Sequence, residues 1–487
     1  MKHDIPEEVR AVVDQLEAIK HEAYLVGGCV RDLLLGKTPK DWDVTTDATP
    51  EEIQKVFPDS FYENDFGTVG IKTESEEPSL AVVEVTPYRI ESTYSNARHP
   101  DQVTFSKSLE DDLKRRDFTM NAVAYNPSRD KLVDPYGGEE AIRLKKIVAV
   151  GDPKDRFAED ALRMLRAIRL SAELDFVIDS ETADAIAKHA KLLEKVSKER
   201  VRDELFRIIR SDTPMLALFI AQRLGLLRHI IPELEEGIGC DQNQAHSFDV
   251  FEHSLRSLQH GADKNYSFEV RLAALLHDVG KPASRHFDKE KNDYTFHGHE
   301  VIGARMAKKI MRDLKFPRDT ATVVEKLVRW HMFFSDPDAI TLSAVRRMIR
   351  NVGVDHIQEL LELRTCDRIG TGRPKEQPFR FRKYKSMVDE ALRDPISVAM
   401  LKIDGAHVME IAEEGPGPKV GWILHALLEE VLDDPTLNTK EYLEKRAREL
   451  SKLPPNELKR LGEQGKERGA EEDIKEVEEL RKRHHVR

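Results

Sequence analysis

A glycine pair followed by two alternating aspartates most restricts what this chain can fold into. Gly27 and Gly28 lie between an apolar segment, Ala23 to Val26, and the start of an expected helix that carries Arg31 and Asp32. Such a turn presents free backbone N–H groups to an anion, and an arginine adds a two-point ligand for phosphate. We therefore expect a phosphate-binding turn here.

The two aspartates, Asp41 and Asp43, lead into a strand-like segment, Val44-Thr45-Thr46. Because residues i and i+2 of a strand point to the same face, their carboxylates are expected side by side. Carboxylate oxygens are preferred ligands of Mg²⁺. Either motif alone is typical of an ordinary turn or a solvated loop, but together they indicate a magnesium site for nucleotide chemistry.

Composition restricts the setting of this site. The three cysteines among the 487 residues, Cys29, Cys240 and Cys366, have no paired spacing. This favours a reducing cytoplasm and argues against a disulfide framework or a cysteine zinc site. No apolar run approaches the roughly 20 residues of a membrane span, and the charged N-terminus has no signal-peptide core. The formal charge of −12 opposes nucleic-acid binding, so such contacts must come from local basic patches.

The apolar pattern predicts an α+β chain of five parts. Residues 1–150 alternate short strand and helix patterns, which indicates a small α/β head, and a long all-α body follows. The body divides into a neck at 151–236, a histidine-rich domain at 237–375, a helical tail at 376–453 and a charged extension at 454–487. Expected strands of the head are 24–26, 42–46, 68–72 and 81–88, and expected helices are 14–21, 30–35 and 50–56.

Two further motifs extend the candidate site of the head. Glu84 is an acid inside an apolar strand; a buried, unpaired carboxylate is costly, so it needs a metal or a cation partner unless it faces water on an edge strand. The three adjacent cations Lys114, Arg115 and Arg116 suit a triphosphate, although such a basic run alone is most often a solvated face. Asp117 and Asn121 can hydrogen-bond a ribose or fix these arginines.

These motifs resemble the class II CCA-adding tRNA nucleotidyltransferases and the bacterial poly(A) polymerases of the polymerase β superfamily. The matching residues are Gly27-Gly28 with Arg31-Asp32, Asp41 with Asp43, Arg115 to Thr119 with Asn121, and Asp134-Pro135 with Gly137-Gly138. The resemblance implies a five-stranded sheet with flanking helices. It also implies two Mg²⁺ ions at Asp41 and Asp43, with Glu84 as third carboxylate, the substrates CTP and ATP, and the tRNA 3′ end and acceptor arm as partner.

Base selection is expected from a motif in the neck. Asp160 and Arg163 lie three residues apart on a helix expected to begin near Arg156, so they would share one face. Such a pair is either a surface ion pair or a reader of a base edge. The resemblance implies the second, with the protein pairing with C or A in place of a template. Arg163, Arg166 and Arg169 are expected to form a basic stripe.

A polar loop at 95–101 carries Arg98. It lacks apolar anchors and therefore indicates a mobile loop. The resemblance implies that a flexible loop with an arginine at this place helps the site to switch from C to A, which disfavours an enzyme that adds only C.

Histidines and aspartates in the middle of the chain indicate a second site. His277-Asp278 ends an apolar helix and would bury a charged acid unless a metal compensates; imidazole and carboxylate suit Mn²⁺, Fe²⁺, Ni²⁺ or Zn²⁺. The pattern resembles the HD phosphohydrolase superfamily at His253, His277, Asp278 and Asp367, with His299 and His331 at the extra positions of two-metal members. The resemblance implies phosphatase or phosphodiesterase chemistry, for instance on a tRNA 3′ end that carries a 2′,3′-cyclic phosphate.

A basic arm follows this second site. Residues 364–385 contain eight Lys or Arg against two acids, with Phe379, Phe381 and Tyr384 interleaved. This composition suits an RNA backbone with some stacking, or equally a basic surface loop. Residues 403–434 resemble the tail of the bacterial tRNA enzymes that holds the tRNA elbow.

The sequence therefore predicts a cytoplasmic, Mg²⁺-dependent tRNA nucleotidyltransferase that builds CCA, fused to an HD metallohydrolase, without an obligate protein partner. The alternatives of the same chemistry are an A-adding enzyme and a poly(A) polymerase. Those of another class are a phosphohydrolase with a regulatory nucleotide-binding head and an RNA-binding scaffold in which neither site is active.

Overall fold

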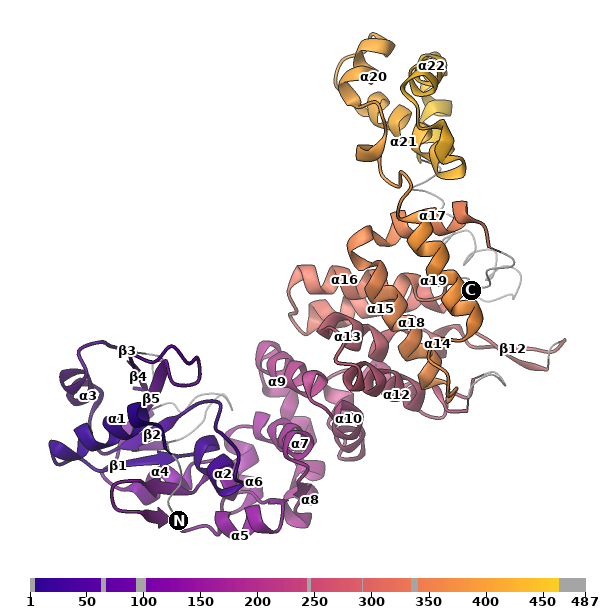
Figure 1. Cartoon of the computed structure of the whole chain (residues 1–487). Helices are drawn as coiled ribbons and strands as arrows, with labels where there is room; N and C mark the ends of the chain where they lie inside the picture. The colour runs from indigo at the N-terminus through magenta and orange to yellow at the C-terminus, as the bar shows by residue number, and fades with distance from the viewer. Residues whose placement is uncertain are drawn as a thin grey trace. The chain divides into compact units, whose positions relative to one another are not determined.

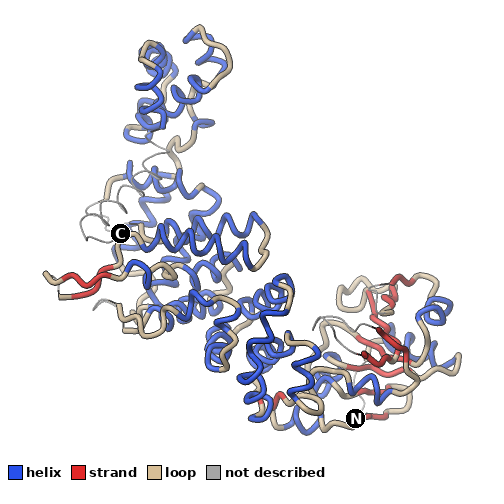
Figure 2. Tube along the Cα trace, turned by 180° about the vertical axis from the view of Figure 1, so that it is seen from behind, coloured by secondary structure: helices blue, strands red, loops and turns tan. Residues whose placement is uncertain are grey.

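The structure, a computed structural model, describes residues 5–62, 67–92, 102–242, 247–290, 292–333 and 340–463. Contacts within the chain divide it into two compact units, Met1–Ile230 and Ile231–Arg487, which are described separately. The strands lie mainly in the first unit, and helices dominate the second (Figure 2). The expected α+β class is therefore confirmed. None of the described helices is both long and apolar enough to cross a membrane.

A mixed sheet forms the centre of the first unit (Figure 1). Its strands lie in the order β3-β4-β5-β2-β1-β8-β9, and only the pair β2 and β5 is parallel. The strands are β1 Ala23–Val26, β2 Asp43–Thr46, β3 Ser60–Tyr62, β4 Val69–Lys72, β5 Val82–Pro87, β8 Ala124–Asn126 and β9 Lys131–Val133. The implied five-stranded sheet is wrong, because the three-residue strands β3 and β9 extend it at both edges.

Period-two burial in β5 explains how the sheet separates its core from its candidate site. Val83 and Val85 are fully buried and pack with α1 (Glu7–Ala18), α2 (Gly28–Leu34) and α3 (Pro50–Val56). Glu84 alternates with these valines and therefore faces the other side, where α4 (Leu109–Lys114) lies.

Two of the expected helices of the head show how far the local sequence determines where a helix begins and ends. Helix α3 has the predicted bounds, because Thr49 and Glu52 form a capping box around Pro50 at the first turn. The helix expected at 14–21 is wrong at both ends. It begins at Glu7, because Val9 and Val12 extend its buried face, and it ends at Ala18, just before Lys20 adopts φ +73°.

The neck begins with a break that the sequence analysis did not foresee. Helix α6 (Pro153–Glu159) ends before Asp160, whose backbone is extended at φ −142° and ψ 102°, and α7 (Leu162–Leu174) starts after Ala161. The expected continuous helix from Arg156 through Arg163 is therefore wrong. The remaining helices are α8 Ser180–His189, α9 Lys198–Arg210 and α10 Pro214–Arg223.

The second unit is a helical bundle whose members come into close contact through glycines. Its helices include α12 Val250–Asp263, α13 Phe268–Leu276, α15 His299–Asp313, α16 Arg318–Trp330, α17 Leu342–Val352 and α18 Ile357–Gly370. A Cβ atom on Gly370 would lie 2.1 Å from Ser257 Oγ and 2.9 Å from the carbonyl oxygen of His253. Only glycine therefore lets α18 approach α12 so closely. The tail contains α19 Phe379–Ala391, α20 Gly405–Ala412, α21 Pro418–Asp433 and α22 Lys440–Ser451.

Replacing this glycine tests the packing of the bundle. Because the new methyl group would overlap backbone as well as side chain, we expect Gly370→Ala to cost about 1–3 kcal/mol in the free energy of unfolding. The control is Gly421→Ala, where nothing lies within 4 Å of the new Cβ in helix α21. That change should be neutral or slightly stabilising. Thermal melting of both variants, followed by circular dichroism, measures the difference, and equal melting temperatures would contradict the packing argument.

Candidate functional site

The glycine turn is the meeting point of the first candidate site. Gly27 has φ +80°, in the region that favours glycine, and α2 begins directly after it. A Cβ atom on Gly27 would lie 3.1 Å from Arg116 Nη1 and 3.4 Å from Asp43 Oδ2. A guanidinium and a carboxylate from distant parts of the chain therefore meet at the backbone turn.

The second glycine completes this convergence. A Cβ atom on Gly28 would lie 3.7 Å from Arg31 Nη2 and 3.9 Å from Asp41 Oδ1. Arg31 donates two hydrogen bonds to Asp32 Oδ1, at 2.9 and 2.8 Å, and one to Asn121 Oδ1 at 3.0 Å. The predicted phosphate ligand is thus held beside the turn by two of the other predicted residues.

Glu84 lies directly beside Asp43 in the sheet. The parallel register of β2 and β5 pairs these two residues, and both side chains are half-buried. The edge-strand interpretation of Glu84 is wrong, because β5 lies between β4 and β2. Hard divalent cations prefer carboxylate oxygens as ligands, so Asp41, Asp43 and Glu84 are chemically suitable ligands for Mg²⁺. Within the described ranges, however, their ligand atoms do not form a group within 4.8 Å, as those of the second unit do.

Asp112, which the sequence analysis missed, holds the two arginines of the basic motif. Its side chain is fully buried; Arg115 Nη2 lies 2.6 Å from Oδ1 and Arg116 Nη2 lies 3.1 Å from Oδ2. Burial favours the neutral acid, but the two guanidiniums outweigh it and hold the pKa of Asp112 below its usual range. The signal was present in the sequence, since residues three and four apart meet on a helix.

Asp117 is saturated by partners within the protein. Its carboxylate accepts hydrogen bonds from Phe118 N at 2.8 Å, Asn121 Nδ2 at 3.1 Å, and Arg166 Nε and Nη2 at 2.9 and 2.8 Å. Burial opposes ionisation of Asp117, yet Arg166 and Asn121 hold its pKa well below the usual range. Asp117 therefore fixes an arginine, but this is Arg166 of the neck and not one of the two arginines of the basic motif, which Asp112 holds.

The two residues of the base-selection motif point to different partners. Asp160 accepts a two-point ion pair from Arg200, 2.6 Å at the shorter contact, and also accepts from Leu162 N, which starts α7. Arg163 donates to Glu159 at 2.8 Å and to the carbonyl oxygen of Arg115 at 2.9 Å. The expected shared helix face is therefore wrong, because the helix breaks at Asp160.

The expected basic stripe is likewise compensated by acids. Arg169 is almost fully buried and pairs with Glu204 at 2.6 Å and with Glu173 at 2.5 Å. Arg166 lies 3.6 Å from Glu204 in addition to its pair with Asp117. Glu204 on α9 therefore ties two of these arginines to the neck, and the arginines do not form a stripe of uncompensated charge.

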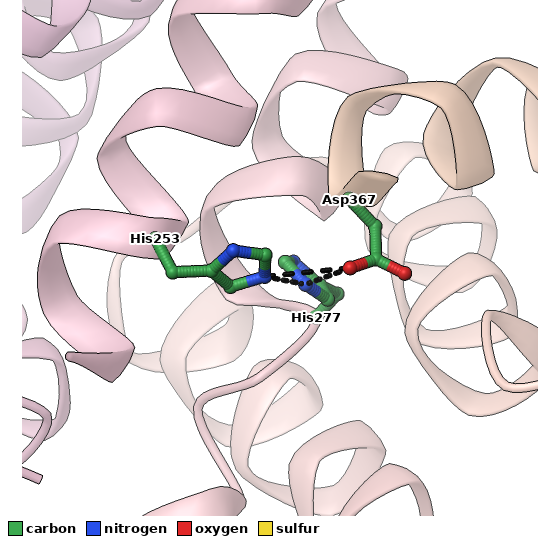
Figure 3. A group of neighbouring side chains, drawn as sticks. All are labelled: His253, His277 and Asp367. Carbon is green, nitrogen blue, oxygen red and sulfur yellow. Dashed lines mark hydrogen bonds and ion pairs between the residues drawn. The ribbon is translucent and has the colours of Figure 1, made fainter. Parts of the chain in front are cut away.

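The second candidate site gathers three buried side chains from separate helices (Figure 3). His253 comes from α12, His277 follows α13, and Asp367 lies on α18. The Nε2 atoms of the two histidines are 2.9 Å apart, and Asp367 Oδ1 lies 3.4 Å from His253 Nε2. The close contact between α12 and α18 thus places these ligands together.

Asp278 joins this trio to a second one. Its Oδ2 lies 3.1 Å from His253 Nε2 and 3.2 Å from His277 Nε2, while its Oδ1 lies 3.3 Å from His299 Nε2 and 3.7 Å from His331 Nε2. The structure therefore brings all six predicted ligands together in two groups, and Asp278 reaches both with one oxygen each.

Three of the imidazole rings are oriented by a backbone carbonyl nearby in the chain. Nδ1 of His277, His299 and His331 lies 2.8, 2.7 and 2.7 Å from the carbonyl oxygen three residues earlier. Because a carbonyl only accepts, Nδ1 carries the proton and the Nε2 lone pair points into the cluster. Lone pairs that face each other in a buried site repel unless a cation lies between them, so this donor set fits a transition metal.

Four of the six ligands, Asp278, His299, His331 and Asp367, line a cavity of about 1010 Å³. Lys281 Nζ lies 2.7 Å from Asp278 Oδ2, and Arg364 pairs with Asp367. The sequence analysis did not predict that these two cations contact the ligands. The other basic residues that line the cavity are Arg368, Arg373 and Arg380.

The basic arm keeps only one of its three predicted stacking residues. Phe381 is 5% exposed and Tyr384 is fully buried, because they follow the helical period of α19 toward its core side. Phe379, at the first position of α19, is 70% exposed and lines the cavity. The expectation of interleaved aromatics is therefore wrong for two of the three residues.

Protein-family comparison divides the chain into three matched parts. Residues 23–148 match the poly A polymerase head domain, residues 175–238 the probable RNA and SrmB-binding site of polymerase A, and residues 250–368 the HD domain. The first part contains the glycine turn, the three acids and the basic motif of the first candidate site, and the third contains the six ligands of the second. Asp160 and Arg163 lie between the first and second matched parts.

Relatives extend this match over most of the chain. The CC-adding tRNA nucleotidyltransferase of Thermus thermophilus is 32% identical over 418 residues, which are 84% of this chain and 89% of that protein. The CCA-adding enzyme of Geobacillus sp. (strain WCH70) is 43% identical over 225 residues, 45% of this chain and 53% of the relative; the matches thus span about half the length of the Geobacillus relatives. The Bacillus stearothermophilus CCA-adding enzyme, solved in complex with CTP, has a TM-score of 0.68 at 26% identity over 91% of this chain and 96% of its own. The chain belongs to the family of tRNA nucleotidyltransferases and poly(A) polymerases.

The two ligand groups of the histidine–aspartate cluster predict how many metal ions the chain binds. Because imidazole nitrogen suits Ni²⁺, we expect the untagged chain to retain about two Ni²⁺ ions after equilibrium dialysis and His331→Ala to retain about one fewer. The control is His356→Ala, which removes a partly exposed histidine that lies 2.7 Å from Glu359 and belongs to neither ligand group. Elemental analysis measures the content, and equal Ni²⁺ in all three proteins would contradict the two-group arrangement.

Proposed function

We propose that the first unit transfers nucleotides from CTP and ATP to the 3′ end of tRNA and builds the CCA sequence. The observation that carries this proposal is the convergence of Arg116, Asp43, Arg31 and Asp41 on the Gly27–Gly28 turn. Phosphate ligands and metal-binding carboxylates at one turn are the parts that phosphoryl transfer requires. The names of the relatives support tRNA as the acceptor.

In this mechanism Asp41, Asp43 and Glu84 would hold Mg²⁺, which supplies polarisation of the phosphoryl oxygens and activation of the attacking hydroxyl. The turn N–H groups, Arg31 and Arg116 bind the triphosphate and neutralise the charge that develops on it. Since these groups are fixed before the substrate arrives, positioning and electrostatic stabilisation supply most of the rate.

Base selection is the second part of the proposal. Asp160 and Arg163 would read the edge of C or A once they exchange their present partners, Arg200 and the carbonyl oxygen of Arg115, for the base. A base with the wrong donors and acceptors would leave these partly buried groups unpaired, which is costly. Arg98, the residue expected to favour A addition, lies outside the described residues.

We further propose that the second unit hydrolyses phosphoesters. The carrying observation is the buried cluster of six ligands beside a cavity with a basic wall. The bound metals would be Mn²⁺, Fe²⁺, Ni²⁺ or Zn²⁺, and the substrate a phosphorylated RNA end. In this proposal the chain divides into a head (1–150), neck (151–236), HD domain (237–375), tail (376–453) and extension (454–487), and it works in the cytoplasm without an obligate protein partner.

Single-nucleotide extension tests the transfer reaction. With Mg²⁺, tRNA transcripts that lack CCA, end in C, or end in CC should receive labelled CMP and AMP until CCA is complete and then stop. Addition of CMP alone, as the name of the Thermus thermophilus relative suggests, would replace CCA addition by CC addition. Addition of AMP only to the CC end would indicate an A-adding enzyme, and long A tails a poly(A) polymerase.

A pair of variants separates the two proposed activities. Asp41→Ala should lower CMP incorporation by a factor of about 10³ or more, because positioned charge supplies most of the rate, and should leave phosphoester hydrolysis unchanged. Asp278→Ala should do the reverse. Loss of both activities in a folded Asp41→Ala protein would contradict the two-site assignment, and hydrolysis without any transfer in the wild type would favour the regulatory-head alternative.

A further inference from the structure

The cavity beside the histidine–aspartate cluster has a wall that its metal ligands do not explain. Helix α18 contributes Arg364 and Arg368, the loop after it contributes Arg373, and α19 begins with Phe379 and Arg380. We call this set the α18–α19 wall.

Few acids face this wall among the residues that the structure describes. Of the described residues that line the cavity, only Asp278 and Asp367 carry a carboxylate, and both belong to the cluster. Arg364 is committed to Asp367, but Arg368 Nε donates to a neutral acceptor, the carbonyl oxygen of Lys375, at 2.6 Å. Arg373 pairs with no carboxylate within the described ranges. The wall therefore favours an anion beyond the reach of the cluster.

The loop that carries Arg373 is anchored. Glu376 Oε1 lies 2.7 Å from Lys264 Nζ on α12, and the contact between Arg368 and Lys375 ties the same loop to α18. Gly372, with φ +88°, makes the turn between these anchors. Since the loop is tied at both helices, Arg373 is presented from a defined position and not from a loose surface segment.

Phe379 adds an aromatic surface to this charged wall. Its ring is 70% exposed, whereas Phe381 on the same helix is buried. A single exposed phenylalanine is ordinary on a protein surface. Here, however, the ring lines the cavity next to Arg380, and the alternation of guanidiniums with an exposed ring is the arrangement that stacks a base and binds its phosphates.

We propose that the α18–α19 wall recognises one nucleotide of a phosphorylated polynucleotide end. Phe379 stacks on the base, Arg373 and Arg380 bind the phosphate on the far side of that nucleotide, and the terminal phosphoester lies toward Arg364 and the cluster. Binding of the nucleotide by these residues does not require the proposed hydrolase function. Only the hydrolysis of the terminal phosphoester rests on that function.

A tryptophan at position 379 reports binding directly. Phe379→Trp keeps an aromatic ring, and its fluorescence should be quenched by adenosine 3′,5′-bisphosphate and not by ribose 5-phosphate, which has no base. The wild-type chain, titrated in the same way, gives the contribution of Trp42, Trp330 and Trp422 and of nucleotide bound at the head. Quenching no greater than in the wild type would overturn the stacking role.

The second phosphate is tested in the same Phe379→Trp background. Arg373→Gln should weaken the bisphosphate about tenfold, a loss of about 1.4 kcal/mol, because one charged hydrogen bond to the 5′-phosphate is removed. It should leave adenosine 3′-monophosphate, which lacks the 5′-phosphate on the far side, little affected. The matched control is Arg382→Gln, an exposed arginine of α19 that donates to Gln377 and does not line the cavity. Equal affinities of the bisphosphate for all three proteins would overturn the role of Arg373.

Hydrolysis assays distinguish failure of this inference from failure of the hydrolase function. Phe379→Leu should raise KM for an oligonucleotide 3′-phosphate about tenfold, because base stacking contributes about 1–3 kcal/mol, and leave p-nitrophenyl phosphate unchanged. Unchanged KM for both substrates would overturn recognition while the hydrolase function stands. Base-dependent quenching without hydrolysis by the wild type would support recognition and remove the hydrolase function.

Discussion

Two buried carboxylates, each neutralised by arginine, hold the first candidate site together. Asp112 has no exposed surface and fixes Arg115 and Arg116, the second of which reaches the Gly27 turn. Asp117 binds Arg166 from the neck and orients Asn121, which accepts from Arg31 in turn. A buried charge that loses its partner costs about 3–5 kcal/mol, so each acid forces its arginine into one position. The phosphate ligands are thereby ordered before a nucleotide binds.

The second unit satisfies the same constraint by different means. Asp278 and Asp367 are also buried, but they contact imidazoles, and three rings of the cluster are fixed by the carbonyl oxygen three residues earlier in the chain. Lys281 and Arg364 balance part of the charge. The Nε2 lone pairs that face one another require a positive charge between them, which a metal ion would supply. Around Asp112 and Asp117 in the head, arginine side chains supply the positive charge. The same cost of buried charge thus produces an arginine-ordered site in one unit and a metal-demanding site in the other.

Local patterns predicted what depends on neighbours in sequence. The glycine turn, the bounds of α3 and the six ligands of the second site were all recognisable. What failed depends on tertiary contacts. The break at Asp160 is stabilised by Arg200, forty residues away. The role of Asp117 depends on Arg166, forty-nine residues away, and the burial of Tyr384 on the core that its helix meets. A chain read alone shows which charges exist, but not which of them are already paired.

The central claim is that a buried ion network orders the nucleotide-binding arginines, and the affinity of Asp117→Asn for CTP tests it most directly. Asparagine keeps the shape of the side chain and removes the charge that holds Arg166. Loss of about 1.4 kcal/mol or more of ordering predicts at least tenfold weaker CTP binding. Glu140→Gln, which removes a surface partner of Arg143, is the control and should bind CTP normally. An Asp117→Asn protein with native circular dichroism and unchanged CTP affinity would contradict the account.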